Sequence, residues 1–129
     1  VDLKKDISVL NHAYNDKSGI TALFNKNLLN RINGELDANL NPDNFSHHAY
    51  YNEQRGRMEM HLVSKMIQKV SINNMQFNFV SGETIHTENS YKYTIAEFHA
   101  LAQRAGFTSD RVWTDNEQLF SVYYFSVSQ

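Results

Sequence analysis

The first part of the chain shows the spacing of apolar residues that is typical of helices. Ile7, Leu10 and Tyr14 recur every three or four positions, which predicts a helix over residues 4–14. The turn-forming segment at residues 15–19 should end it.

A second, longer helix is predicted directly after this turn. Its apolar residues form one stripe at helical spacing, and its polar residues mostly lie off that stripe, so the stripe is most simply core. The stripe consists of Ile20, Leu23, Phe24, Leu28, Ile32 and Leu36, and the polar residues are Asn25, Lys26, Asn30, Arg31 and Glu35.

After a connector rich in Asn and Asp, helical spacing gives way to the alternation of apolar and polar residues that predicts strands. We expect strands at residues 45–52, 57–72 and 75–80, hairpin turns at 53–56 and 73–74, and a closing pair of strands within residues 111–127.

A further strand is predicted between Gly82 and Tyr93, and its polar face carries candidate chemistry. Strict alternation places His86, Glu88, Ser90 and Lys92 on one face, and Ile85, Thr87, Asn89 and Tyr91 on the other. Glu88 and Ser90 then lie roughly 7 Å apart along the same face. A carboxylate only accepts hydrogen bonds, whereas a hydroxyl donates and accepts, so the pair suits a ring with two polar nitrogens. The simpler interpretation of such a face is that water covers it.

The segment Thr94-Ile95-Ala96-Glu97 has the spacing of a capping box and predicts the start of a helix. Gly106 stands where a left-handed residue would end that helix. The fold class expected is therefore α+β: N-terminal helices, an antiparallel β-meander, one further helix and closing strands, in a single domain over residues 1–129.

Composition narrows the function classes. The chain has 129 residues, a formal net charge of −2 and no cysteine. Without a basic run it is not expected to bind nucleic acid, and without a long apolar segment it is not expected to enter a membrane. The absence of cysteine and of an apolar leader makes the cytoplasm the expected location.

Six histidines raise the question of a metal. His47 and His48 are adjacent and should point to opposite faces of a strand, and no His-x-x-x-His motif is present, so metal ligation is not expected. A metal-dependent hydrolase that uses His47, His61 and His86 stays open as an alternative. So does a non-catalytic α+β module that binds a small molecule or a peptide.

Six stretches together resemble one known family. The chain is similar to the C-terminal part of the histidine-specific, S-adenosylmethionine-dependent methyltransferases, a family whose type member makes the trimethylated histidine of the ergothioneine pathway. The resemblance is carried by residues 2–6 (DLKKD), 13–16 (AYND), 19–29 (GITALFNKNLL), 57–62 (RMEMHL), 82–93 (GETIHTENSYKY) and 112–115 (VWTD).

The resemblance implies a substrate-recognition lobe together with the last strands of a Rossmann-like methyltransferase domain. It implies that Glu88 and Ser90 grip the imidazole of a histidine-like amino acid, that Met60 packs against the ring, that Tyr14 binds the substrate carboxylate and that Thr21 lies near the reacting amine. It assigns no catalytic residue to this chain.

The resemblance also bears on cofactor and partners. S-adenosylmethionine belongs to the intact enzyme, and its binding residues fall in an N-terminal methyltransferase domain that this chain lacks. The chain alone is therefore expected to bind no cofactor and to be inactive. Apolar surface left bare by the missing domain makes a homodimer plausible.

Overall fold

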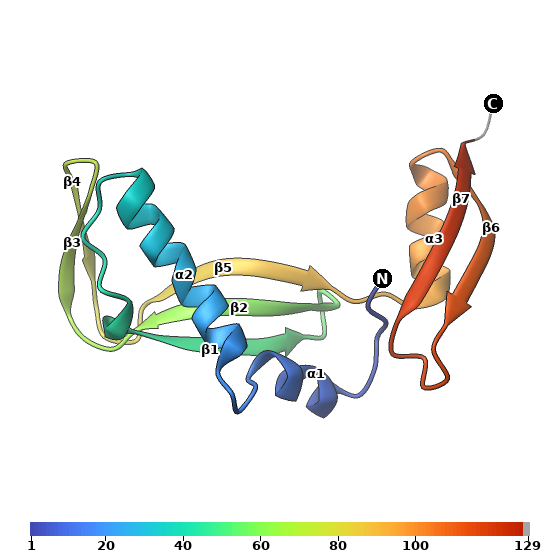
Figure 1. Cartoon of the computed structure of the whole chain (residues 1–129), viewed down its shortest axis with the longest axis horizontal. Coiled ribbons are helices and arrows are strands. Elements are labelled where there is room, and N and C mark those ends of the chain that lie inside the picture. Colours follow the sequence, from blue (N-terminus) through green and yellow to red (C-terminus); the bar gives the residue numbers. More distant parts are fainter. Residues whose placement is uncertain (128–129) are drawn as a thin grey trace.

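The computed structural model describes residues 1–127 and confirms an α+β fold with antiparallel strands. Two groups of elements lie side by side: α1, α2 and β1 to β5 form the larger, and α3, β6 and β7 form the smaller (Figure 1). No helix within residues 1–127 combines the length and the apolar character needed to cross a membrane. The elements are α1 (Ile7–Tyr14), α2 (Ile20–Glu35), the short 3-10 helix η1 (Pro42–Asn44), β1 (Phe45–Asn52), β2 (Arg57–Ser64), β3 (Gln68–Ile72), β4 (Met75–Phe79), β5 (Thr84–Tyr91), α3 (Ile95–Arg104), β6 (Phe107–Thr114) and β7 (Ser121–Val127).

Capping side chains decide where the helices begin. The Asp6 carboxylate accepts a hydrogen bond from the Ser8 backbone N–H at 2.7 Å, so α1 begins at residue 7 and not at residue 4. The predicted capping box is confirmed, since Thr94 and Glu97 each accept from the other's backbone N–H. Gly106 has the left-handed conformation expected after α3, with φ of 85°.

The main sheet has the strand order β1-β2-β5, and all its pairs are antiparallel. Between β2 and β5 the chain makes a separate hairpin, β3 with β4, whose turn residues Asn73 and Asn74 have positive φ as expected of a tight turn. The prediction of a single strand over residues 57–72 is wrong, because two strands, β2 and β3, occupy this range. The chain leaves the sheet after Ser64, whose hydroxyl donates to the Met66 carbonyl at 2.8 Å and holds the bend.

The core of the larger group lies between its sheet and the two N-terminal helices. One cluster contains Leu29, Leu40, Phe45, Leu62 and Val70, and the other contains Leu10, Ala49, Met58 and Met60. The prediction that the apolar stripe of α2 is core is wrong for most of its members. Leu23 and Phe24 are 69% and 65% exposed, whereas Asn25 and Leu29 are buried.

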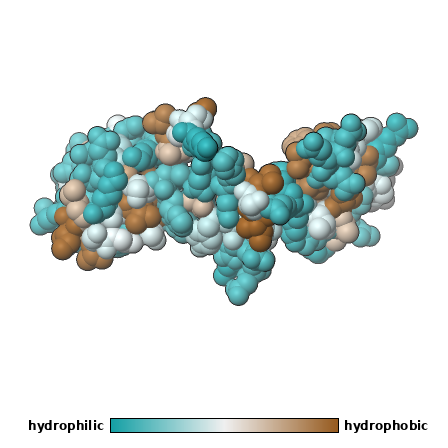
Figure 2. Space-filling model, turned by 90° about the horizontal axis from the view of Figure 1, so that it is seen from below, coloured by the Kyte–Doolittle hydropathy of each residue, from teal (hydrophilic) through white to brown (hydrophobic). Residues whose placement is uncertain are grey.

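In the smaller group α3 covers one face of the β6–β7 hairpin. The Phe98 ring lies 4.7 Å from that of Tyr123, measured between centroids. Val122 and Tyr124, the neighbours of Tyr123 along β7, point to the other face of the hairpin and stay exposed. Figure 2 shows apolar residues at the surface at both ends of the molecule. The closing strands were expected only from residue 111, but β6 begins at Phe107.

The N-terminal segment connects the two groups. Its first residues lie beside the start of β7, where the Ser121 N–H donates to the Val1 carbonyl at 2.8 Å and the Leu3 N–H donates to the Leu119 carbonyl at 3.1 Å. The Lys4 N–H then donates to the Tyr93 carbonyl at 3.0 Å. Two passages of the chain, residues 1–6 and 92–94, therefore run together from one group to the other (Figure 1).

Candidate functional site

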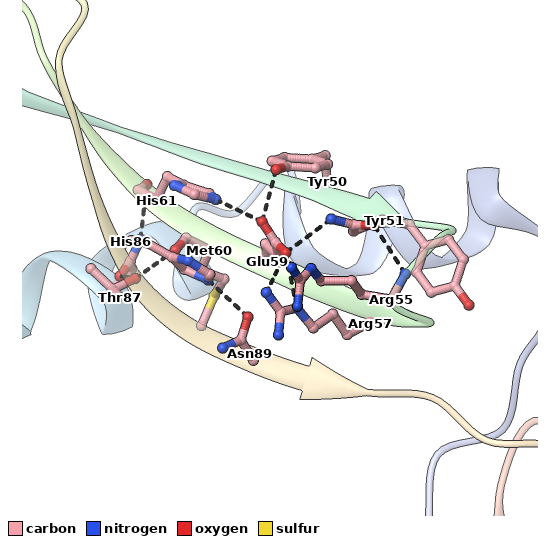
Figure 3. A network of polar contacts seen from close by, with 12 residues as sticks. Tyr50, Tyr51, Arg55, Arg57, Glu59, Met60, His61, His86, Thr87 and Asn89 are labelled. Atoms are coloured by element: carbon pink, nitrogen blue, oxygen red, sulfur yellow. Dashed lines mark hydrogen bonds and ion pairs between the residues drawn. The ribbon is translucent and has the colours of Figure 1, made fainter. Parts of the chain in front are cut away.

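A β-bulge in β5 decides which of its side chains face the helices. Met60 pairs with Glu88 and His61 pairs with His86, which leaves Thr87 as an extra residue without a partner on β2. The Thr87 hydroxyl lies 2.9 Å from the Met60 carbonyl. The polar contacts around this part of the sheet are shown in Figure 3.

The bulge overturns part of the predicted alternation. Residues that pair directly across antiparallel strands share a face, so Glu88 and Ser90 both lie with Met60 and Met58 on the helix-covered face. The prediction that His86 shares this face is wrong. Its ring stacks on that of His61 on the opposite face, with 4.4 Å between centroids.

Tyr14, Ser90 and Lys92 form a compact hydrogen-bonded triangle. The Tyr14 hydroxyl donates to Ser90 Oγ at 2.9 Å, and Lys92 Nζ donates to the Tyr14 hydroxyl at 2.8 Å and to Ser90 Oγ at 2.9 Å. Lys92 also pairs with Asp2 Oδ2 at 2.7 Å, and its side chain is only 1% exposed. The structure thus brings two of the predicted substrate residues, Tyr14 and Ser90, into direct contact.

The connection between α1 and α2 fixes Tyr14 in this position. Asn15 binds β1 through both of its amide atoms, because Nδ2 donates to the Ala49 carbonyl at 2.9 Å and Oδ1 accepts from the Ala49 N–H at 3.3 Å. The Tyr14 carbonyl lies 2.8 Å from His47 Nε2. The last turn of α1 is therefore tied to the sheet beside the triangle.

Glu88 lies next to a cleft of about 220 Å³ between α2 and β5. Phe24 and Arg31 of α2 line this cleft together with Glu88. Glu88 is exposed, and its carboxylate has no hydrogen-bond or ion-pair partner among residues 1–127. It is thus an acceptor-only group that is available to a ligand.

The two remaining predicted residues, Met60 and Thr21, take no part in the hydrogen-bonded triangle. Met60 is 3% exposed and belongs to the buried cluster against which Tyr14 packs. It therefore supports the site from the core. Thr21 lies in the first turn of α2, where its N–H donates to Asp16 Oδ1 at 2.9 Å. Within residues 1–127 no hydrogen bond joins Thr21 to the other four, and the roles of all five residues stay predictions.

The uncovered face of the sheet carries a second polar network, centred on Glu59 (Figure 3). Its carboxylate accepts from Tyr50 at 2.7 Å, from Asn52 at 3.1 Å and from Arg57 Nε at 2.9 Å. Hydrogen bonds from the Tyr50 hydroxyl and the Arg57 guanidinium lower the pKa of Glu59 to about 2. Burial lowers the pKa of His61 below its ordinary value, more than its hydrogen bond to Glu59 raises it.

This network does not match the metal-dependent hydrolase considered from the sequence. His61 and His86 lie with Glu59, but His47 contacts Asn25 and the Tyr14 carbonyl on the helix-covered face. That triad is therefore not assembled. The Glu59 carboxylate is already occupied by the Arg57 guanidinium and by neutral donors, which makes the group a structural hydrogen-bond network.

Sequence reasoning missed the roles of Lys92, Asp2 and Asn25. Lys92 was placed on the polar face but not expected to be buried, and its position two residues after Ser90, just past the end of β5, is the one signal of its role in the sequence. The Asp2 carboxylate reaches it from far away in sequence. Asn25 was grouped with the polar residues off the apolar stripe of α2, although it is 3% exposed.

Comparisons with known proteins agree with one another. The family model described as histidine-specific, SAM-dependent methyltransferase matches residues 1–127. The chain is 37% identical over 116 residues to the histidine N-alpha-methyltransferase of Mycolicibacterium smegmatis (strain ATCC 700084 / mc(2)155). It is 39% identical over 116 residues to the histidine N-alpha-methyltransferase of Mycobacterium tuberculosis (strain CDC 1551 / Oshkosh). Each match covers 88% of this chain but only 36% of the relative.

Proposed function

The chain belongs to the family of histidine-specific, SAM-dependent methyltransferases, and from this premise we propose that it is the substrate-recognition part of an enzyme that methylates the α-amine of histidine or a related amino acid. The chain spans about a third of the length of the curated relatives it matches. The intact enzyme would use S-adenosylmethionine, and a cytoplasmic location belongs to the same proposal.

The observation that carries the proposal is the pairing of an unoccupied carboxylate with a fixed hydroxyl on one face of β5. Glu88 accepts only, and the Ser90 hydroxyl is held in the triangle with Tyr14 and Lys92. An imidazole with one N–H and one bare nitrogen offers the complementary pair of groups. A site that hydrogen-bonds both ring nitrogens rejects analogues that lack one of them.

The contribution of these residues to the reaction is positioning. S-adenosylmethionine, when bound by the rest of the enzyme, supplies a methyl group attached to a sulfonium sulfur. This chain would hold the imidazole through Glu88 and Ser90 and the carboxylate through Tyr14, so that the uncharged α-amine points at the methyl group. Fixing reactants in line accelerates a reaction without any covalent intermediate on the protein.

The residues that would hold the donor are expected in the part of the relatives that this chain does not cover. The chain has five glycines and no Gly-x-Gly-x-x-Gly turn. We therefore expect the chain alone to be inactive.

Joining the chain to its upstream donor-binding part and changing Glu88→Ala tests the proposal. We expect kcat/KM for L-histidine to fall about 10- to 100-fold, because a hydrogen bond to a charged group contributes about 1.5–3 kcal/mol. Glu117→Ala, an exposed carboxylate in the turn between β6 and β7, is the control and should leave kcat/KM unchanged.

An unchanged kcat/KM in the Glu88→Ala variant would contradict the assignment. Binding of histidine without any methyl transfer by the joined protein would instead favour the non-catalytic binding module.

A further inference from the structure

Asn25 is a buried amide that connects α2 with three strands of the main sheet, and it is 3% exposed. Its Nδ2 donates to the His61 carbonyl at 3.2 Å and lies 3.0 Å from His47 Nδ1, and its Oδ1 accepts from the Thr87 hydroxyl at 2.6 Å. A carbonyl only accepts, so the contact with His61 fixes which end of the amide faces each neighbour. Both hydrogens of the amide nitrogen are thereby used.

This orientation leaves His47 with one arrangement of its ring hydrogens. The amide nitrogen of Asn25 only donates, so His47 Nδ1 must accept and carries no hydrogen. His47 Nε2 lies 2.8 Å from the Tyr14 carbonyl, which only accepts, so Nε2 carries the hydrogen. An imidazolium would turn a second N–H against the amide hydrogen of Asn25. The ring is therefore expected to be neutral, in the Nε2–H tautomer.

These contacts form a chain between two of the predicted substrate residues. One end is the Tyr14 carbonyl at the end of α1, and the other is Thr87, the extra residue of the bulge, which directly precedes Glu88. Asn15 ties the same end of α1 to the backbone of β1. The chain through His47 extends that tie to α2 and β5.

We propose that His47 is a positioning residue, which acts as a neutral ring and couples Tyr14 to the strand segment that carries Glu88. Through Asn25 and Thr87 it sets the distance between the group that meets the substrate carboxylate and the group that meets the imidazole. This inference rests on the proposed function, because it assumes that Tyr14 and Glu88 contact those two ends of histidine. The coupling runs through the Tyr14 backbone carbonyl, so the hydroxyl hydrogen of Tyr14 stays available to the ligand.

Three charged residues share a cleft with His47: Asp16, Lys26 and Lys65. The Asp16 carboxylate accepts from the first N–H groups of α2, and Lys65 Nζ donates to the Asp43 carbonyl at 2.8 Å. Within residues 1–127 no charged side chain bonds to a ring nitrogen of His47, so the ring keeps its two neutral partners.

The experiment compares the affinities of the full-length enzyme for L-histidine and for histamine, which keeps the imidazole and the amine but lacks the carboxylate. Isothermal titration calorimetry with S-adenosylhomocysteine in place of the methyl donor measures both without turnover. In the wild type we expect histidine to bind about 10- to 100-fold more tightly, the usual gain from one hydrogen bond to a charged group. In His47→Leu we expect this preference to fall about 5-fold or more, the coupling typical of groups within one hydrogen-bond network.

Two variants serve as matched controls. His47→Gln offers an amide oxygen to Asn25 and an amide N–H to the Tyr14 carbonyl, so the preference for histidine should stay within about 2-fold of wild type. His48→Leu makes the same change at the next residue of β1, whose ring lies on the opposite face beside Tyr50. It should also keep the preference.

An unchanged preference in His47→Leu would overturn the inference, since a merely structural histidine would weaken the binding of both ligands alike. An equal fall in His47→Gln would assign the effect to the shape of the ring and would overturn it as well. The same holds for an equal fall in His48→Leu, because the effect would then not depend on the chain of hydrogen bonds.

The wild type provides an independent measurement, which decides the question even where His47→Leu does not fold. Nitrogen-15 spectra of the histidine rings at neutral pH, with the His47 signals identified by their loss in His47→Gln, should show the ring hydrogen on Nε2. A hydrogen on Nδ1 would overturn the inference. Binding of neither ligand by the wild type, or of both with equal affinity, would overturn the proposed function instead.

Discussion

Thr87 is the extra residue of the β-bulge, and it places His86 and Glu88 on opposite faces of the sheet. Its hydroxyl lies 2.6 Å from Asn25 Oδ1 and 2.9 Å from the Met60 carbonyl, so it points toward α2 like the next residue, Glu88. Asn25 in turn donates to the His61 carbonyl at 3.2 Å. A buried amide of α2 therefore stabilises the irregular backbone that carries Glu88.

The first residue-scale prediction concerns this amide. Asn25→Ala removes an acceptor from Thr87 and a donor from the His61 carbonyl, both within the buried interior, so we expect a loss of about 2 kcal/mol in the free energy of unfolding. Urea denaturation of the chain measures it. Asn30→Ala, on the exposed side of the same helix, should change the stability by less than about 0.5 kcal/mol, and equal losses in both variants would contradict the role of Asn25.

A second residue-scale prediction follows from His61 and Glu59. The pKa of His61 is lowered in the folded chain, so below the ordinary value of about 6.5 the unfolded chain takes up a proton that the folded chain refuses. Stability should therefore be greatest above pH 6.5 and decline as the pH falls below it. A further decline is expected below about pH 4.5, because Glu59 stays ionised in the folded chain down to about pH 2.

Thermal unfolding followed by circular dichroism between pH 8 and pH 3 would show both declines. The variant His61→Gln should lack the first of them and keep the second. A melting temperature that rises between pH 7 and pH 5 in the wild type would contradict the sign of the His61 effect.

At the scale of elements, local signals in the sequence predicted the helices and turns well. Thr94, Glu97 and Gly106 act through neighbours in sequence, and the structure confirms each of them. The bulge at Thr87 was not predictable, because it depends on pairing with β2 and on a buried amide of α2. Of the site, the common face of Glu88 and Ser90 followed from alternation, whereas the burial of Lys92 depends on the distant Asp2.

The prediction that the apolar stripe of α2 is core was wrong for a different reason. Helical spacing correctly showed that one side of α2 is apolar, but it does not tell which partner covers that side. In this chain the sheet packs instead on the side that carries Asn25 and Leu29. The apolar side is left exposed.

An element-scale prediction tests the cap of α3. Thr94→Ala removes the side-chain oxygen that accepts the Glu97 N–H at 3.1 Å, and we expect a loss of about 1 kcal/mol of stability. Thr94→Ser keeps the oxygen and should stay close to wild type. Hydrogen exchange of the first-turn amides of α3 locates the effect, and unchanged exchange in Thr94→Ala would show that the cap does not hold this helix.

At the scale of the whole molecule, apolar side chains remain exposed on both groups of elements. Leu23 and Phe24 on α2 and Tyr124 on β7 are at least 60% exposed. The β6–β7 hairpin is covered by α3 on one face only and leaves Val122 and Tyr124 exposed on the other, which fits the expectation that it belongs to a larger sheet. The predicted homodimer of the isolated chain draws on the same exposed surface and stays a prediction.

A whole-molecule prediction separates the chain from the intact enzyme. In the isolated chain, the double change Leu23→Ser and Phe24→Ser removes exposed apolar surface, so we expect weaker self-association with stability within about 0.5 kcal/mol of wild type. In the joined enzyme the same change should lower the melting temperature, because the surface would be covered there. Sedimentation velocity and thermal unfolding test both statements, and a large loss of stability in the isolated chain would contradict them.

The paired passages between the two groups have one more consequence. Asp2 lies on the first passage and Lys92 on the second, so their salt bridge at 2.7 Å is also a crosslink at the joint between the two groups. Any twist of one half against the other pulls on that crosslink. Loss of the Asp2 carboxylate would therefore loosen the joint and would leave the buried Lys92 ammonium with only the hydroxyls of Tyr14 and Ser90 as partners.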